Sequence, residues 1–467
     1  MQRLLITWIL LLTAINSCWA QSRSTKVRNK ECPSYIYRVT LRDKQNSPYS
    51  IDRPSRFLSR RSIERRRKQN LPLDSTDLPV TPKYVRQIES SRAVIIGESK
   101  WNNTVLAQMK DTSDVQRIRQ LPFVMDCKMV WKAPDSIAPT ALKTKYEESF
   151  HEWDSVASSP YGRADAQIKV VNGNRLHDIN CMGEGMMIGV LDGGFKNVDK
   201  IPAFSKVDIK GTRDVVYPTS PSVFYEIDHG TKVLSTMAIQ HPNYYIGTAP
   251  KASYWLVRCE DTQTEQEIEE DYWAIAAEFA DSVGCDLINS SLGYNDFDKG
   301  YESHKLWQLD GHSTLISKSA SLAAKKGMIL VNSAGNSGMG PWKKITFPAD
   351  ADDCLTVGAV TDMLTNAPFS SVGPTQDGRV KPDVVAIGSP ATVVTGRGSI
   401  AEDMGTSFAA PIICGLTACL WQALPGKTAL EVMELIRQSG NNKEHPDNVL
   451  GYGLPNFWRA YMVGKMK

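Results

Sequence analysis

The spacing of apolar residues divides the chain into regions with different periodicities. In residues 21–130, the segment Tyr35–Leu41 alternates between apolar and polar positions, which is typical of a half-buried strand. Further strands are predicted at 93–96 and 123–130, with a short helix near 115–119 between them. This mixture predicts a small α+β unit that is separate from the rest of the chain.

From Gly162 onward, short apolar runs alternate with longer helical patterns. The runs resemble strands that are buried on both faces, and they lie at 186–191, 254–257, 287–289 and 328–332. A helix is predicted over Ile268–Val283, with an apolar face made of Ile268, Tyr272, Ile275, Ala276, Phe279 and Val283. Strands that alternate with helices in this way predict a doubly wound α/β domain over 161–467, with a parallel sheet between helices.

The first twenty residues form a separate segment. Arg3 precedes an apolar stretch over 4–15, and Cys18 to Ala20 approximates a small-x-small cleavage site. The stretch is shorter than the roughly 20 residues that span a bilayer. We therefore expect a removed signal peptide over 1–20 and export to the periplasm or the medium. The alternative is a lipoprotein anchored through Cys18. Asn16 fits the sequence signal for such lipid attachment poorly.

The rest of the composition is that of a globular protein without a strong charge bias. Apolar residues make up 42%, charged residues 22%, and the formal net charge is +3. A basic run at 60–68 has no aromatic stacking platform beside it, so we interpret it as a solvated helix face and expect no nucleic-acid partner. No later segment is apolar enough over its length to predict a membrane span.

Two further features concern maturation and redox state. Residues 131–160 contain Pro134, Pro139, Pro160 and several serines, which predicts an exposed linker with a processing site. Nine cysteines are present, and several lie inside apolar runs, where a free cysteine acts as a small hydrophobic residue. An even number of cysteines in an exported chain allows disulfides, but we expect mostly buried thiols and assign no particular pairing.

Three short segments carry residues suited to acyl transfer. Asp192 follows the apolar run 186–191, and active groups gather beyond the carboxyl ends of parallel strands. His229 begins a predicted helix, and Gly230 beside it leaves room for another group to approach the imidazole. Ser407 also starts a helix, where small neighbours leave space and the helix N-terminus favours negative charge. Taken singly, each has an ordinary structural explanation as a turn, surface or capping residue.

Together these segments carry a family resemblance. The order Asp-Gly-Gly at 192–194, His-Gly-Thr at 229–231 and Gly-Thr-Ser-Phe-Ala-Ala-Pro at 405–411 resembles the three signatures of the subtilisin superfamily. Ser-Leu-Gly at 291–293 and Ser-Ala-Gly-Asn at 333–336 resemble its substrate-binding and oxyanion segments. Segments near 57–66 and 270–294 are similar to members from Bacteroidetes-type bacteria.

The resemblance implies a serine endopeptidase with protein or peptide substrates. It assigns a triad of Asp192, His229 and Ser407, and an oxyanion donor, Asn336. The substrate-binding residues that it implies are Ser291, Leu292, Gly293, Ala334 and Gly335. The unit 21–130 is then a propeptide that assists folding and acts as a transient inhibitor of a self-processing zymogen. The chemistry implied needs no cofactor; a structural calcium ion occurs in many members, but no acidic cluster here identifies its ligands.

The sequence departs from the family pattern at three positions. Gly193 stands where Ser or Thr is usual, Phe408 where Met is usual, and Lys232 where well-known members have a second histidine. We expect the first change to weaken the hydrogen bonding around Asp192.

Other classes of protein fit less well. A lipase would need Gly-x-Ser-x-Gly, but Ala409 replaces the second glycine. A zinc protease would need His-Glu-x-x-His, but in the segment that begins at His151 the fifth position of this motif is Ser155. The alternative from another class is a catalytically inactive subtilisin-like module used for binding. The presence of all three triad residues and Asn336 argues against it.

Overall fold

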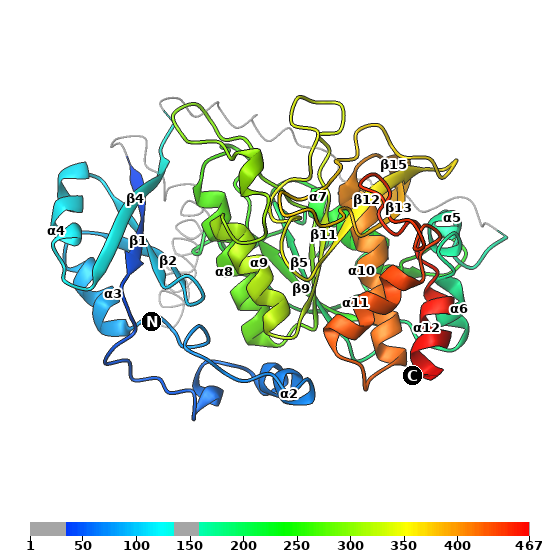
Figure 1. The fold of residues 1–467 in the computed structure, drawn as a ribbon, viewed down its shortest axis with the longest axis horizontal. Coiled ribbons are helices and arrows are strands. Elements are labelled where there is room, and N and C mark those ends of the chain that lie inside the picture. Colours follow the sequence, from blue (N-terminus) through cyan, green and yellow to red (C-terminus); the bar gives the residue numbers. More distant parts are fainter. Residues whose placement is uncertain (1–33, 135–157, 467) are drawn as a thin grey trace, which may run out of the picture.

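The structure is a computed structural model that describes residues 34–134 and 158–466 (Figure 1). It contains a small antiparallel unit packed beside a large layered domain. The expected signal peptide 1–20, with Cys18, and most of the expected linker 131–160 lie outside the described residues.

The N-terminal unit is an α+β fold, as its alternating pattern predicts. Its antiparallel sheet has the order β2-β3-β1-β4. The strands are β1 (Tyr35–Leu41), β2 (Val94–Ser99), β3 (Thr104–Met109) and β4 (Val124–Lys132). The helices are η1 (Pro54–Arg56), α2 (Arg60–Lys68), α3 (Pro82–Glu89), η2 (Thr112–Asp114) and α4 (Val115–Arg119). Val39, Val105 and Ile118 belong to a hydrophobic core made of residues of this unit, whereas Ile36 and Leu106 pack in the cluster that includes α8.

The large domain is built on a seven-stranded sheet in which every paired neighbour is parallel. The strand order is β13-β12-β11-β10-β5-β9-β6. The strands are β5 (Met187–Asp192), β6 (Asp208–Asp214), β9 (Ser253–Arg258), β10 (Leu287–Ser290), β11 (Ile329–Ser333), β12 (Cys354–Thr361) and β13 (Val384–Ser389). This confirms the predicted parallel sheet, because each apolar run forms a strand that is buried on both faces.

Helices cover both faces of this sheet (Figure 1). On one face lie α8 (Ile268–Val283) and α9 (Leu315–Lys325); on the other lie α7 (His229–Ala238), α10 (Thr406–Ala423), α11 (Ala429–Gln438) and α12 (Phe457–Met466). The remaining elements are α5 (Asp165–Lys169), α6 (Asn174–Asp178), η3 (Pro202–Phe204), η4 (Leu306–Gln308) and the hairpins β7 (Gln240–His241) with β8 (Tyr245–Ile246) and β14 (Ala391–Val394) with β15 (Ile400–Asp403).

Helix α8 is covered on two sides. It has the predicted bounds, and Tyr272 and Ala276 are buried in the domain core. Its opposite side contacts β2 of the N-terminal unit, where a Cβ on Gly97 would lie 2.7 Å from Ile275 Cδ1. Acidic residues of α8 are therefore buried as well. The sequence predicted one buried apolar face for this helix and did not predict that its polar face is also covered.

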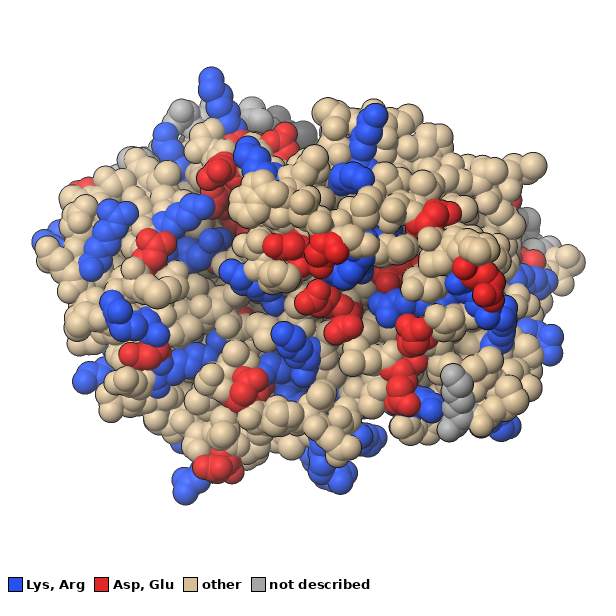
Figure 2. All heavy atoms as spheres, viewed as in Figure 1, with Lys and Arg blue, Asp and Glu red and all other residues tan. Residues whose placement is uncertain are grey.

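The interpretation of residues 60–68 as a solvated helix face holds for the exposed Arg60, Arg67 and Lys68 but is wrong for Arg65 and Arg66. Arg65 and Arg66 of α2 are only 4% and 2% exposed, and both pair with Asp281 at the end of α8. Asp77 pairs with Arg66 at 2.7 Å, so the buried guanidinium groups have counter-charges. The sequence did not reveal this because Asp281 lies more than 200 positions away along the chain. On the face drawn in Figure 2, basic and acidic side chains are interspersed.

Two observations concern the hydrophobic interior. Among the described residues, one helix, α10, is long and apolar enough to cross a bilayer, and 89% of the tested stretch is buried in the domain. The described cysteines are free thiols, and all but Cys181 are buried, which confirms the expectation for Cys285, Cys414 and Cys419.

Candidate active site

Asp192 lies at the topological switch point of the sheet, where the strand order changes direction. It ends β5, which lies between β9 and β10, and the chain builds the sheet outward on both sides of this position. Such a reversal leaves a crevice beyond the carboxyl ends of the strands. The Asp192 side chain is fully buried, and its Oδ1 accepts a hydrogen bond of 2.8 Å from Gly193 N. This donor is the backbone N–H, which any residue at 193 would supply, so the expected weakening from the missing side-chain hydroxyl stays a prediction.

His229 meets this carboxylate from the first position of α7. Its Nδ1–H donates to Asp192 Oδ1 at 2.9 Å and to Oδ2 at 3.0 Å. A Cβ on Gly230 would lie 2.5 Å from Gly194 O and 2.9 Å from Asp192 Cβ, so only glycine permits this approach of helix and turn. Gly230 thus makes room for the turn after β5, so the group that approaches at this position belongs to the protein itself.

The Asp192 carboxylate changes the proton affinity of His229. Burial opposes the charged imidazolium, but the charge and hydrogen bond of Asp192 outweigh it and raise the pKa of His229 to about 9. Glu260 contributes in the same direction, and Lys232 opposes it. An imidazole held in this way has one fixed tautomer, with Nε2 free to exchange a proton with another group.

Ser407 lies in the first turn of α10 and is 8% exposed. Its Oγ donates to Ser291 O at 3.3 Å, and Ser291 Oγ donates to Ser407 O at 2.8 Å. Within the described part of the chain, Ser407 forms no hydrogen bond to His229, although the ring of the adjacent Phe408 lies 5.8 Å from the imidazole. Catalytic hydrogen bonds are often incomplete until substrate is bound.

Asn336 is oriented by the residue that precedes Ser407. Its Oδ1 accepts hydrogen bonds of 3.0 Å from both the backbone N and the Oγ1 of Thr406. The amide Nδ2 must then point elsewhere: a Cβ on Gly405 would lie 3.7 Å from it and 3.6 Å from Ser407 N. Two N–H donors thus border the same space, an arrangement that can stabilise an oxyanion.

The expected substrate-binding segments follow neighbouring strands. Residues 291–293 continue from β10, and Ala334 and Gly335 continue from the adjacent β11. Thr346 contacts both segments. Its Oγ1 would lie 2.1 Å from a Cβ built on Gly293 and 2.7 Å from a Cβ built on Gly335. Its hydroxyl is buried without a hydrogen-bond partner. Sequence reasoning missed Thr346, which comes from a loop that has no recognisable signal.

Glu260 is a second residue that the sequence analysis did not identify. It follows β9, and burial together with the charge of Asp192 raises the pKa of its carboxyl to about 7, while His229 and Arg258 oppose the shift. The argument that selected Asp192, a carboxylate just beyond a buried parallel strand, would also have selected Glu260.

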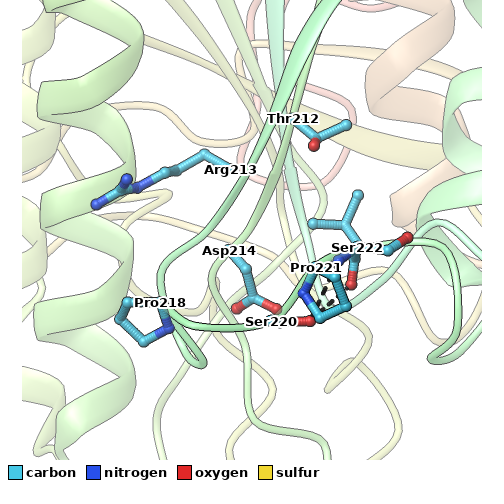
Figure 3. Close-up of a pocket in the computed structure, with 8 residues that line it drawn as sticks. Thr212, Arg213, Asp214, Pro218, Ser220, Pro221 and Ser222 are labelled. Carbon is cyan, nitrogen blue, oxygen red and sulfur yellow. Dashed lines mark hydrogen bonds between the residues drawn. The ribbon is translucent and has the colours of Figure 1, made fainter. Parts of the chain in front are cut away.

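A separate hollow of about 250 Å³ lies at the end of β6 (Figure 3). It is lined by Thr212, Arg213, Asp214, Pro218, Ser220, Pro221, Ser222 and Val223. Ser220 closes the turn by donating to Ser222 O at 2.9 Å and accepting from Ser222 N at 3.4 Å. None of the candidate triad residues lines this hollow, so it is distinct from the site at β5.

The described residues contain no group of three or more His, Cys, Asp or Glu side chains arranged to hold a metal ion. The donor set that a structural calcium ion would need is therefore not identified in this part of the chain.

Comparison with known proteins agrees with the fold. The sequence pattern of the Subtilase family matches residues 183–453, and that of the peptidase S8 propeptide domain of Bacteroidota matches 36–148. The chain belongs to the Subtilase family. Subtilisin DY of Bacillus licheniformis is 26% identical over 61% of this chain and 92% of its own length. M-protease of Shouchella clausii is 25% identical over 80% of this chain and 86% of its own length. The protein is thus a subtilisin-like serine endopeptidase with a propeptide.

Proposed function

We propose that the protein is an exported serine endopeptidase that uses Asp192, His229 and Ser407 as its triad and matures by cutting itself. The observation that carries the proposal is the pair of contacts, 2.9 and 3.0 Å, between His229 Nδ1 and the buried Asp192 carboxylate. Ser407, at the N-terminus of the helix that packs on α7, supplies the nucleophile.

In this mechanism His229 moves protons and Asp192 orients it. His229 Nε2 removes the proton of Ser407 Oγ as the oxygen attacks the peptide carbonyl. Asp192 holds the tautomer and stabilises the imidazolium that forms. The proton then passes to the leaving amine, and water hydrolyses the acyl-enzyme. Before these steps can begin, the Ser407 hydroxyl must turn away from Ser291 O, its acceptor in the free site, and towards His229.

The negative charge on the carbonyl oxygen is stabilised by Asn336 Nδ2 and Ser407 N. Thr406 fixes the orientation of the amide through two 3.0 Å hydrogen bonds to Asn336 Oδ1, so Nδ2 needs no reorganisation when charge develops. A donor of this type contributes roughly 10²–10³ in rate. The substrate backbone lies along 291–293 and 334–335, which border the same site.

The N-terminal unit acts as propeptide and transient inhibitor. It covers α8 through charged contacts such as Arg38 Nη2 to Asp271 Oδ2 at 2.5 Å. Cleavage within 131–160 would separate it, and we place the start of the mature chain between Trp131 and Gly162. Residues 1–20 direct export, to the periplasm or the medium.

The Ser407→Ala variant tests this proposal. We expect it to lose cleavage of a denatured protein and labelling by a fluorophosphonate, because the attacking oxygen is gone. Ser205→Ala, which alters an exposed serine after η3, is the matched control and should keep both activities. Labelling that persists in Ser407→Ala would assign the nucleophile elsewhere. A wild-type protein that neither labels nor cleaves would favour the inactive binding module.

A further inference from the structure

We infer that Glu260 selects substrates with a lysine or arginine side chain at the position that passes over Gly193 and His229. This inference rests on the proposed triad and specifies its substrate class. It assigns Glu260 a role in specificity, in addition to the residues that perform or orient the chemistry.

The first observation is the place of Glu260 beside the triad. Arg258 ends β9 directly opposite Asp192 in the parallel pair of strands, and Glu260 lies two residues further on. A Cβ on Gly193 would lie 2.6 Å from Glu260 Oε2. The carboxylate therefore fills the space that a serine or threonine side chain would occupy at position 193, the residue next to Asp192.

The second observation is that this carboxylate makes no hydrogen bond or ion pair in the described part of the protein, although the charges of His229 and Arg258 act on it. It is half-buried, and none of the hydrogen bonds or ion pairs involves it. The neighbouring Arg258 guanidinium is already engaged: its Nε donates to Gly193 O at 3.1 Å, and its Nη1 lies 3.4 Å from Asp214 Oδ2. A carboxylate near Asp192 that makes no direct ion pair is stabilised further by a positive charge supplied from outside.

The third observation is the character of the surrounding wall. Ile227 Cδ1 and Thr262 Cγ2 would each lie 3.1 Å from the same Cβ position on Gly193. Ile227 is 37% exposed, so its side chain is available for contact. Methyl groups beside a carboxylate suit an aliphatic stem that ends in a cation, which describes lysine and arginine. An acidic side chain would meet like charge at this position.

Ionisation of Glu260 should make the preference depend on pH. The groups that affect its proton affinity are Asp192, His229, Arg258 and Asp261, and the groups that it affects in turn include Cys259, Glu265, Glu269 and Tyr294. The raised pKa, about 7, means that the carboxyl is neutral in acid and charged in alkali. Attraction for a cationic side chain should therefore grow as the pH rises through 7.

The experiment compares matched peptide substrates with the mature, self-processed enzyme. Peptides carry lysine or its uncharged isostere norleucine at each position around the scissile bond, and kcat/KM is measured at pH 6 and pH 8.5. At one position we expect lysine to be favoured roughly ten- to hundredfold at pH 8.5, the range for a hydrogen-bonded charge, and less at pH 6. Glu260→Gln should bring that ratio close to one. Glu184→Gln, at the exposed turn before the opposite end of β5, is the control of equal charge change and should keep it.

The outcomes separate this inference from the proposed function. An enzyme that cleaves both peptides of every pair equally is a protease without this specificity, and it overturns the inference alone. A lysine preference that survives in Glu260→Gln also overturns it. A protein that cleaves no peptide and no denatured protein overturns the proposed function and the inference together. A wild-type ratio that is equal at pH 6 and pH 8.5 overturns the inference without any variant, so the inference can be refuted even if Glu260→Gln does not fold.

Discussion

At the scale of single residues, the site depends on how closely His229 and Asp192 approach each other. The contact requires glycine at 230, because any Cβ there would collide with Gly194 O and Asp192 Cβ. A second contact, from Arg258 Nε to Gly193 O at 3.1 Å, holds the turn that carries Asp192. Residues without a chemical role thus determine whether the imidazole can be oriented.

The Asp192–His229 pair predicts an alkaline pH profile. Asp192 raises the pKa of His229 to about 9, and only the neutral imidazole can act as a base, so kcat/KM should rise with pH well above the ordinary histidine value. In Asp192→Asn the midpoint should move to lower pH and kcat should fall by roughly 10⁴, since the tautomer is no longer fixed. The measurement is kcat/KM against pH for both proteins. An unchanged rate and profile in the variant would reduce Asp192 to a structural role.

At the scale of elements, α8 connects the two parts of the molecule. Asp271, Glu278 and Asp281 lie seven and three residues apart, on one face of the helix. Arg38 pairs with Asp271, and Glu278 accepts hydrogen bonds from Ser99 Oγ, from Lys100 N at 2.7 Å and from Trp101 N at 3.1 Å. Asp281 is surrounded by Arg65, Arg66 and Lys100. The face that the propeptide covers is therefore acidic, and its partners are basic or backbone donors.

Glu278 makes retention of the propeptide sensitive to pH. Burial raises its pKa to about 7 in the complex, against the opposing effect of Lys100 and the hydrogen bonds. A raised pKa means that the complex binds the proton more tightly than the separated enzyme does. Binding is therefore favoured in acid and weakens as the pH rises through 7, by up to roughly a hundredfold.

The measurement is the fraction of the N-terminal unit that stays with the processed enzyme on size-exclusion chromatography at pH 6 and pH 9. We expect more retention at pH 6, and Glu278→Gln should remove most of the difference because the neutral amide cannot ionise. Glu402→Gln, on the exposed strand β15, should behave as wild type. Retention that is equal at both pH values in the wild-type protein would contradict the role of Glu278.

At the scale of the whole molecule, the N-terminal unit holds the domain at two places. Its sheet lies against α8 through β2, while α2 reaches the far end of α8 and the end of α9 (Figure 1). There Arg65 Nε donates to Lys326 O at 3.2 Å, and Lys326 Nζ pairs with Asp77 of the unit at 2.9 Å. Two separated contact areas should keep the unit bound after the connection to the domain is cut.

Self-cleavage is tested on the complete chain. Wild type should yield a mature chain that begins between Trp131 and Gly162, whereas Ser407→Ala should lose only its signal peptide, because no nucleophile remains to cut the linker. Mass spectrometry of both proteins, made in a host without its own extracytoplasmic proteases, gives the two masses. Processing of the variant at the wild-type position would mean that another protease matures the chain. If neither protein is cut, the N-terminal unit is a permanent domain.

Much of the fold could be predicted from the sequence because the buried face of a helix or strand carries apolar residues at a regular spacing. The bounds of α8 and α4, and strand β1, follow from the side chains of each element alone. The family could also be recognised, since its signatures are short and each is continuous in the chain. The sequence itself thus determined the class of protein, the sheet and the candidate triad.

Only the tertiary structure decided which distant groups meet. Arg65 and Arg66 are buried because Asp281, more than 200 residues away, supplies their counter-charge. Glu260 lies beside Gly193 because β9 and β5 are neighbours in the sheet, although the two residues are far apart in the chain. Periodicity reports whether a side chain is buried and not what it is buried against. The charges around the site therefore depended on strand order and helix packing, which no local pattern contains.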